Sequence, residues 1–485
     1  MQAFDLEKSV VKLCLLVFFV MMLLGVLLHF CSLDKIPYGF HVDEMSGSVA
    51  IGCLASEGVD AHNVRYPLFA DLNYGTPKPP TYLYPALVWV KIFGYSVPSL
   101  RALSVTVHIV GIAGLFFLAH FLFGWRYAVL TVAVAVFSPW AWVLSRVAFE
   151  SLFAVTFLIW GLYVFLRASR PWAMVLAAVL LAGAMYSYPP IRLQTPLILL
   201  PLIIYSRMKY RLSWKSLAVF SIVFIILLIP LAQKIITSHS LLQRFNQISI
   251  FSPDYLRSIG SNGNWIQLMQ IFGYVYVLHF NPNFLFFKGD LSYVHSTRHF
   301  GILSWMDMAG LGIGLVFLVM LLFKPGRKDN PLLVHGHWLI FLIVGVLIGV
   351  VPVAFTSSEI PNSLRIMGAW PFICLLTGFF LWQACERWWG MWLVTVLITA
   401  LFAFAFLKVY FQVYPKESKG MFGYWTLEEA NQLKTDDDWL KFVLLYRHDD
   451  YNARYFLMQY RGLTCTQSRT LWERLRDFLL SRGKY

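Results

Sequence analysis

Two adjacent carboxylates, Asp43 and Glu44, stand in the stretch PYGFHVDEMS, a few residues after an unbroken hydrophobic run. A carboxylate in such a place can act as a general base that takes the proton from a hydroxyl group. Two acids in a loop can equally be ordinary solvated charges. The position alone leaves both interpretations open, and Asp43 and Glu44 are therefore candidate catalytic residues.

Lys78 lies further along the same loop, before a Pro-Pro pair and an aromatic, amphipathic stretch that includes Tyr82. This stretch is short and begins with prolines, which favours a segment at the membrane surface over one that crosses it. A lysine there can hold an anionic headgroup as a compact point charge, or it can simply extend its ammonium into water. Tyr82 is a candidate substrate contact.

Arg146 and Glu150 are four residues apart in the segment SRVAFE, so they share a face if the segment is helical. They form either a loop salt bridge or part of a functional site, because ionisable groups near bilayer depth are costly and are often functional. Arg192 and Arg365 also lie at predicted outer edges of the membrane. With Lys78, these three arginines are candidates for binding the phosphate of a donor substrate.

A second long loop contains His279, Asp290, His295 and His299, which are candidate metal ligands. His295 and His299 have the i,i+4 spacing of one helix face, but no HExxH motif accompanies them. A divalent metal ion is thus left open as a cofactor. Asp290 and Arg298 of this loop are also candidate substrate contacts.

The elements that position these residues follow from composition. The chain has 485 residues, of which 59% are hydrophobic, 17% aromatic and only 13% charged. Runs of about 20 apolar residues match the thickness of a bilayer's hydrocarbon core, so we predict a polytopic α-helical membrane protein. Eleven candidate spans fall at residues 10–30, 98–122, 127–140, 151–167, 172–188, 193–206, 214–234, 305–323, 337–355, 366–384 and 390–411.

Charge placement predicts the topology. The net charge of +14 comes from 39 Lys and Arg against 25 Asp and Glu. The basic residues lie mostly in short loops between apolar runs, which excludes nucleic acid as a partner and places the N-terminus in the cytoplasm. Two long loops, 31–97 and 235–304, and the C-terminus then face outwards. These outer loops have no Asn-x-Ser/Thr sequon, which favours a bacterial inner membrane.

Two domains are predicted. Residues 1–412 form a transmembrane catalytic domain, and residues 413–485 form a small periplasmic domain in which charged residues become frequent. Within the latter, residues 442–460 are predicted to form a short strand and then a helix, and residues 468–482 an amphipathic helix. The fold class is therefore a polytopic helical membrane protein with two long outer loops and a small C-terminal α/β domain.

Two further features are neutral. The six cysteines show no CxxC motif and no metal-ligand spacing, although Cys31 and Cys53 could pair in an oxidising compartment. The run of acids at 436–438 is interpreted as carboxylates at a helix N-terminus, where negative charge is favourable.

Several of these segments, taken in order, resemble a known family. HVDEMS, EGVDAHNVRYPLF and KPPTYLYP near the start, then SPWAWVLSRVAFESLF, HFNPNFLFFKGD and LRIMGAWPF, are similar to segments of the GT-C glycosyltransferases. The resemblance covers about residues 1–410. Within the GT-C class, these segments resemble more specifically the branch of protein O-mannosyltransferases and the lipid A aminoarabinose transferase. This resemblance implies the GT-C fold, a polyprenyl-phosphate sugar donor, an outer-face active site and inversion at the anomeric carbon.

The resemblance also implies roles for single residues. Asp43 matches the first-loop acid that acts as catalytic base, with Glu44 beside it. Lys78 matches the lysine that holds the donor phosphate, and Glu150 falls where relatives often carry a second acid.

A metal site is implied less directly. His279 is the nearest candidate for a loop histidine that joins a metal site in some relatives. Thr76 and Pro77 stand where the aminoarabinose enzyme supplies an acidic metal ligand before KPP.

The sequence therefore predicts an inverting glycosyltransferase that moves a sugar from a polyprenyl-phosphate donor to a periplasmic acceptor. The acceptor could be lipid A, another glycan, a lipid or a protein hydroxyl. The alternative is a transporter or flippase for lipid-linked sugars. Transporters tend to carry inverted repeats and charges at the membrane midplane, whereas the charges here cluster at one predicted face.

Overall fold

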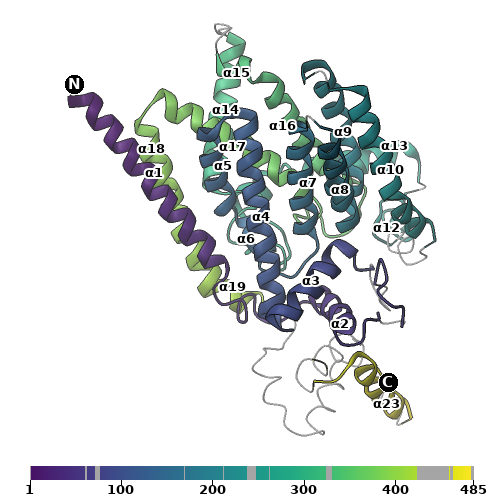
Figure 1. Cartoon of the computed structure of the whole chain (residues 1–485). Coiled ribbons are helices and arrows are strands. Elements are labelled where there is room, and N and C mark those ends of the chain that lie inside the picture. Colours follow the sequence, from purple (N-terminus) through teal and green to yellow (C-terminus); the bar gives the residue numbers. More distant parts are fainter. Residues whose placement is uncertain are drawn as a thin grey trace. The chain divides into compact units, whose positions relative to one another are not determined.

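The computed structural model describes residues 2–60, 63–70, 77–168, 170–210, 212–237, 247–261, 263–323, 330–422, 458 and 462–481. Within these ranges the chain is helical (Figure 1). It forms no β-strand there, only isolated β-bridges.

Each of the eleven predicted spans coincides with a helix. The helices are α1 (Gln2–His29), α4 (Val97–Phe123), α5 (Trp125–Val136), α7 (Ser151–Arg167), α8 (Pro171–Ser187), α9 (Pro189–Tyr210), α10 (Trp214–Thr237), α14 (Trp305–Phe323), α16 (Gly336–Ala354), α17 (Trp370–Arg387) and α18 (Gly390–Lys408). The shorter helices are α2 (Val42–Ser56), α3 (Pro80–Phe93), α6 (Pro139–Ser145), α12 (Pro253–Ser258), α13 (Trp265–Leu278), α15 (Pro331–Val334), α19 (Tyr414–Glu417) and α23 (Cys465–Ser481), with the single turns η1 (Asn283–Phe287), η2 (Met367–Ala369) and η3 (Val409–Val413).

Fewer helices than eleven meet the length and composition of a full span. Among the described residues six do so, or seven if α5 and α6, bent by 58°, count as one span. Helices α7 and α8 have 17 residues each, which at 1.5 Å per residue is less than the roughly 30 Å of a hydrocarbon core. The chain is thus a multi-pass helical membrane protein with six to seven candidate spans, and the count of eleven stays a prediction.

The chain divides into two compact units. Unit 1 comprises Met1–His29, Val107–Leu144 and Ser151–Tyr410, and unit 2 comprises Phe30–Thr106, Ser145–Glu150 and Phe411–Tyr485. The C-terminal segment thus clusters with the first long loop, while the predicted division between residues 412 and 413 stays a prediction.

Unit 1 is built around α17. This helix packs against α5, α14 and α16. Of its most apolar stretch, 94% of the residues are buried, as expected of an interior helix that is hydrophobic on all sides. Gly378 of α17 leaves no room for a side chain beside Thr131 of α5, so the two backbones approach closely. By contrast, α10 is more apolar than α17 yet only 11% buried, which suits a helix whose surface faces lipid.

Unit 2 contains two short helices, α2 and α3, that pack together. Helix α2 starts where His41 caps its N-terminus and Glu44 closes a reciprocal capping box. Helix α3 starts with Pro80 at its first turn, a position where the missing N–H of proline costs nothing. An isolated bridge between Ala70 and Lys78 fixes the strand-like approach to α3.

The C-terminal segment is tied to α2 by a disulfide between Cys53 and Cys465. The pairing of Cys53 with Cys31 that the sequence allowed is therefore wrong. The helix predicted at residues 468–482 is confirmed as α23. The strand and helix predicted at residues 442–460 lie outside the described residues except for Met458, as do the acids at 436–438, and the part of the chain that is described shows no α/β domain.

Candidate active site

The predicted site residues fall into two groups. Unit 2 contains six of them: Asp43, Glu44, Lys78, Tyr82, Arg146 and Glu150. Unit 1 contains the other seven: Arg192, His279, Asp290, His295, Arg298, His299 and Arg365. The two groups are described separately below.

The two adjacent acids have opposite environments. Asp43 lies in the first turn of α2 with 64% of its side chain exposed. Glu44, the next residue, is completely buried. The carboxylate of Asp43 is therefore open to a substrate, whereas that of Glu44 is enclosed by protein.

Glu44 forms a buried ion pair with Arg101, a residue that the sequence analysis did not single out. Arg101 donates from Nε to Oε1 and from Nη2 to Oε2, both at 3.0 Å. Glu44 also accepts the backbone N–H groups of His41, at 3.0 Å, and of Ala148, at 2.9 Å. With four donors around it, this carboxylate holds structure together, so its predicted part in proton transfer is not supported by the geometry.

Arg101 also organises the loop before α2. Its Nη1 donates to the carbonyls of Leu33 and Pro37, at 3.1 and 2.9 Å, and its Nη2 to the carbonyl of Gly39, at 2.7 Å. One signal in the sequence could have revealed it, because Arg101 is a single cation at the start of a long apolar helix, where an unpaired charge would be costly.

The segment Ser145–Glu150 contacts both short helices through its backbone. The N–H of Ala148 donates to Glu44, and its carbonyl accepts from the hydroxyl of Tyr82 at 3.2 Å. Burial raises the pKa of the Tyr82 hydroxyl well above its ordinary value, and the negative charges of Glu150 and Glu44 raise it further. Tyr82 thus remains a hydrogen-bond donor that fixes this segment.

Lys78 and Glu150 form a second ion pair. Lys78 Nζ lies 3.5 Å from Glu150 Oε2, and the two side chains are 4% and 16% exposed. At this distance the contact is longer than the roughly 2.7–2.9 Å of a strong charge-assisted hydrogen bond. The pair keeps a cation in a largely buried place without committing its ammonium to a tight bond.

Gly47 of α2 lies four residues after Asp43 and packs against the side chain of Lys78. A side chain at Gly47 would lie 3.5 Å from Lys78 Cε and 3.3 Å from the ring of Tyr82. Asp43 and Gly47 are four residues apart on α2, so they share one face of the helix. Asp43 thus lies about one helical turn before the glycine against which the side chain of Lys78 packs.

Arg146 is fully buried and serves the loop before α2. Its Nη2 donates to the carbonyls of Cys31 and Ile36, at 2.6 and 3.2 Å, and its guanidinium lies over the ring of Phe411. The geometry therefore favours a structural arginine over the phosphate ligand predicted from its charge and position.

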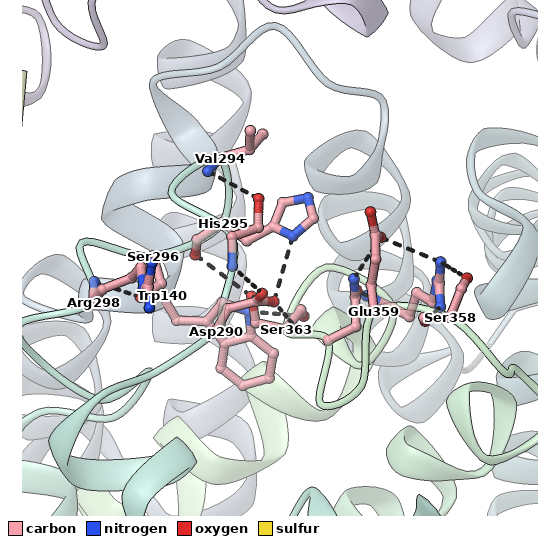
Figure 2. A network of polar contacts seen from close by, with 12 residues as sticks. Trp140, Asp290, Val294, His295, Ser296, Arg298, Ser358, Glu359 and Ser363 are labelled. Atoms are coloured by element: carbon pink, nitrogen blue, oxygen red, sulfur yellow. Dashed lines mark hydrogen bonds and ion pairs between the residues drawn. The ribbon is translucent and has the colours of Figure 1, made fainter. Parts of the chain in front are cut away.

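In unit 1, Asp290 is the centre of a separate polar network (Figure 2). It accepts the N–H and the hydroxyl of Ser363, at 2.7 and 3.0 Å, and its Oδ2 lies 3.4 Å from His295 Nδ1. Burial alone would raise the pKa of Asp290, but His295 and the N–H groups of Ser292 and Ser363 lower it below the ordinary value. Asp290 is thus an ionised, buried anchor between two loops.

His279, one of the three histidines predicted as metal ligands, has other partners in the structure. His279 uses both ring nitrogens, with Nδ1 2.8 Å from the carbonyl of Val275 and Nε2 accepting the N–H of Asn362 at 3.0 Å. Burial lowers the pKa of His279, in keeping with a neutral ring. No group of three His, Cys, Asp or Glu side chains among the described residues could hold a metal ion.

The other residues of unit 1 make local contacts. Arg365 donates to the hydroxyl of Thr356 and the carbonyl of Ser358, and Arg192 donates to the carbonyl of Met185. Arg298 is exposed and lies over the ring of Tyr293. His299 is exposed as well. The predicted phosphate and substrate roles of Arg192, Arg365, Asp290 and Arg298 stay predictions.

No family model matches the chain, and no curated protein matches it. Solved structures are similar to it. ArnT from Cupriavidus metallidurans, bound to undecaprenyl phosphate, gives a TM-score of 0.47 at 13% identity and covers 94% of this chain and 75% of its own. An oligosaccharyltransferase of Archaeoglobus fulgidus, tethered with an acceptor peptide, gives 0.48 at 13% identity and covers 94% and 59%.

The oligosaccharyltransferase AglB from Archaeoglobus fulgidus, in complex with an inhibitory peptide and a dolichol-phosphate, gives a TM-score of 0.47 at 13% identity and covers 94% of this chain and 60% of its own. This chain thus spans about three fifths of the archaeal enzyme. ArnT and AglB are GT-C class enzymes, the class that the sequence motifs resemble. At these TM-scores and identities, the likeness assigns no activity and no residue role.

Proposed function

We propose that this protein is an inverting glycosyltransferase that moves a sugar from a polyprenyl-phosphate donor to a hydroxyl group of an acceptor. The observation that carries the proposal is the face of α2 that presents an exposed carboxylate, Asp43, one turn from Gly47, which packs against the ammonium-bearing side chain of Lys78. A base for the acceptor and a cation for the leaving group are the two groups that such a transfer needs.

The reaction would proceed by a single displacement. Asp43 takes the proton of the acceptor hydroxyl while the oxygen attacks the anomeric carbon from the face opposite the phosphate. The bond between the anomeric carbon and the phosphate oxygen breaks, and polyprenyl phosphate leaves with the electron pair. Lys78 stabilises the negative charge that develops on this leaving group.

The buried residues around the site support this assignment by their fixed geometry. The ion pair of Glu44 with Arg101 fixes the first turn of α2, which carries Asp43. The loose pair of Glu150 with Lys78 balances the charge of the ammonium, so a donor phosphate can take over part of its coordination. No step is assigned to a metal ion.

The disulfide supports a location for the site. Structural disulfides persist in oxidising compartments such as the bacterial periplasm, and the bond between Cys53 and Cys465 lies in the unit that carries Asp43 and Lys78. We therefore place the site on the periplasmic face of a bacterial inner membrane, with the N-terminus in the cytoplasm. The acceptor class, whether lipid A or another glycan, a lipid or a protein, stays open.

The test is a donor panel. Purified protein is incubated with polyprenyl-phosphate sugars of different sugar types, a mixture of membrane-envelope acceptors is added, and released polyprenyl phosphate is measured. Release with one donor that requires the acceptor supports a transferase. Absence of release with every donor, together with movement of labelled donor across vesicle membranes, would instead support the flippase.

A further inference from the structure

His41 stands immediately before α2, where its Nδ1 is close to two different groups of Asp43. Nδ1 lies 3.2 Å from the backbone nitrogen of Asp43, whose N–H it accepts. It also lies 3.7 Å from Asp43 Oδ2. The same nitrogen therefore has a donor and an acceptor of one residue within its reach.

The present contact requires a neutral imidazole. An Nδ1 that accepts a hydrogen bond carries a lone pair, so the ring proton is on Nε2. In this form His41 caps one of the N–H groups that the first turn of a helix leaves without an internal partner. The backbone of Asp43 is then fixed, and the carboxylate keeps its lone pairs for a substrate.

Protonation would reverse the role of Nδ1. The nitrogen then carries a hydrogen and no longer accepts the N–H of Asp43, and a positive charge at a helix N-terminus is unfavourable. A movement of about 1 Å would bring Nδ1 within charge-assisted hydrogen-bond length of Asp43 Oδ2. A carboxylate engaged by a cation is a weaker base, because the cation favours its ionised form.

Several charged groups near His41 in the described part of the chain have partners of their own. Glu44 accepts the backbone N–H of His41 but pairs with Arg101. The imidazole packs against the rings of Phe149 and Phe422. Of the described charged residues near these rings in the sequence, Glu150 pairs with Lys78, and Lys419 lies over the ring of Tyr38. Among the described residues, Asp43 carries a carboxylate oxygen within 3.7 Å of His41 Nδ1, so an imidazolium at position 41 can bind it.

We propose that His41 is a positioning residue for the base: neutral His41 caps α2 and leaves the Asp43 carboxylate open, whereas protonated His41 binds this carboxylate and withholds it from the acceptor. This inference rests on the proposed function, because it assigns a second residue to the same proton transfer.

The test uses His41→Asn, since asparagine is a good N-cap that does not titrate. Release of polyprenyl phosphate is measured at saturating donor, and the ratio of rates at about pH 8 and about pH 5.5 is taken within each protein. In the unsubstituted protein the rate should fall about tenfold, because protonated His41 binds the Asp43 carboxylate and makes it a weaker base. In His41→Asn the fall should be less than about twofold, because asparagine cannot take up a proton and leaves this carboxylate open. Equal falls would overturn the inference.

A second measurement does not depend on turnover. In protein labelled with ¹³C at histidine Cε1, the signal that disappears in His41→Asn belongs to His41. Its titration midpoint should move to lower pH in Asp43→Asn, because the anion that stabilises the imidazolium is removed. An unchanged midpoint overturns the coupling. If the midpoint shifts but the donor panel shows no release of polyprenyl phosphate, the coupling between His41 and Asp43 is supported and the proposed function is rejected. The two failures are therefore distinguishable.

Discussion

Glu44 and Arg101 are 57 residues apart in the chain, yet they form a completely buried ion pair with two hydrogen bonds of 3.0 Å. This relationship separates the two acids of the HVDE segment. Glu44 is enclosed and holds the start of α2, while Asp43, the next residue towards the N-terminus, is left exposed. From their position in the sequence alone, Asp43 and Glu44 were both candidate catalytic residues.

Removing one partner of this pair should destabilise the protein strongly. Arg101→Met leaves the Glu44 carboxylate buried without its cation, which costs about 3–5 kcal/mol in comparable cases. Chemical denaturation in detergent micelles measures the loss of unfolding free energy. The double variant Glu44→Met with Arg101→Met should lose less than the single one, since no uncompensated charge remains. Equal midpoints for Arg101→Met and the unsubstituted protein would contradict this prediction.

Replacing the exposed acid should affect rate and leave stability unchanged. Asp43→Asn is expected to lower kcat by at least about 100-fold, because the amide cannot accept the hydroxyl proton. Its unfolding midpoint should stay where it is, because 64% of the side chain is in solvent. Asp254→Asn is the matched control, since Asp254 is 90% exposed and lies in unit 1. Retained turnover in Asp43→Asn would exclude Asp43 as the base.

Loss of the buried ammonium should weaken use of the donor. Lys78→Met keeps the length of the side chain but removes its charge, and a charge-assisted bond to phosphate contributes about 1.5–3 kcal/mol. We expect kcat/KM for the polyprenyl-phosphate sugar to fall about 10- to 100-fold. Lys91→Met, an exposed residue at the end of α3, provides the control. A change in kcat at constant KM would show that Lys78 acts in the transition state alone.

The attachment of α23 to α2 should depend on pH through Glu57. This carboxylate accepts the N–H and the hydroxyl of Thr466, at 3.0 and 2.7 Å. Burial tends to raise the pKa of Glu57, but the hydrogen bonds from Thr464 and Thr466 and the charge of Arg469 bring it below the ordinary 4.5. A lowered folded-state pKa gives stability that is present above the ordinary value and is lost as the pH falls through the lowered value.

Below about pH 4, an acid-active protease should therefore cleave α23 faster than a protease active at neutral pH cleaves it at pH 7. In Glu57→Gln this acid-dependent difference should largely disappear. A full acid effect in the glutamine variant would assign the pH dependence to another group.

The sequence predicted well what depends on local pattern. Helices occur at all eleven predicted spans, because hydrophobicity sustained over a span is a local signal. A helix also occurs at the amphipathic C-terminal segment. The residues brought together in unit 2, among them Asp43, Lys78 and Glu150, were singled out because charges next to long apolar runs are uncommon.

Interactions with distant residues and with backbone groups could not be predicted from the sequence. Arg101 was missed because its partner is far away in the sequence. Arg146 was interpreted as an anion ligand because nothing in a sequence shows that backbone carbonyls will take up a guanidinium. His279 was a metal candidate for the same reason, since its partners are the carbonyl of Val275 and the N–H of Asn362. Charge shows that a residue needs partners, but only the fold shows whether they are backbone groups or a ligand.

The bond between Cys53 and Cys465 joins residues separated by 412 positions. The ribosome therefore makes Cys465 long after Cys53, once the last residue of unit 1, Tyr410, has been added. Until Cys465 has been synthesised, Cys53 of α2, the helix that carries Asp43, cannot form this disulfide. The covalent link between α2 and the C-terminal segment thus forms only after the membrane helices have been synthesised, so a chain interrupted before Cys465 would insert its spans without this link.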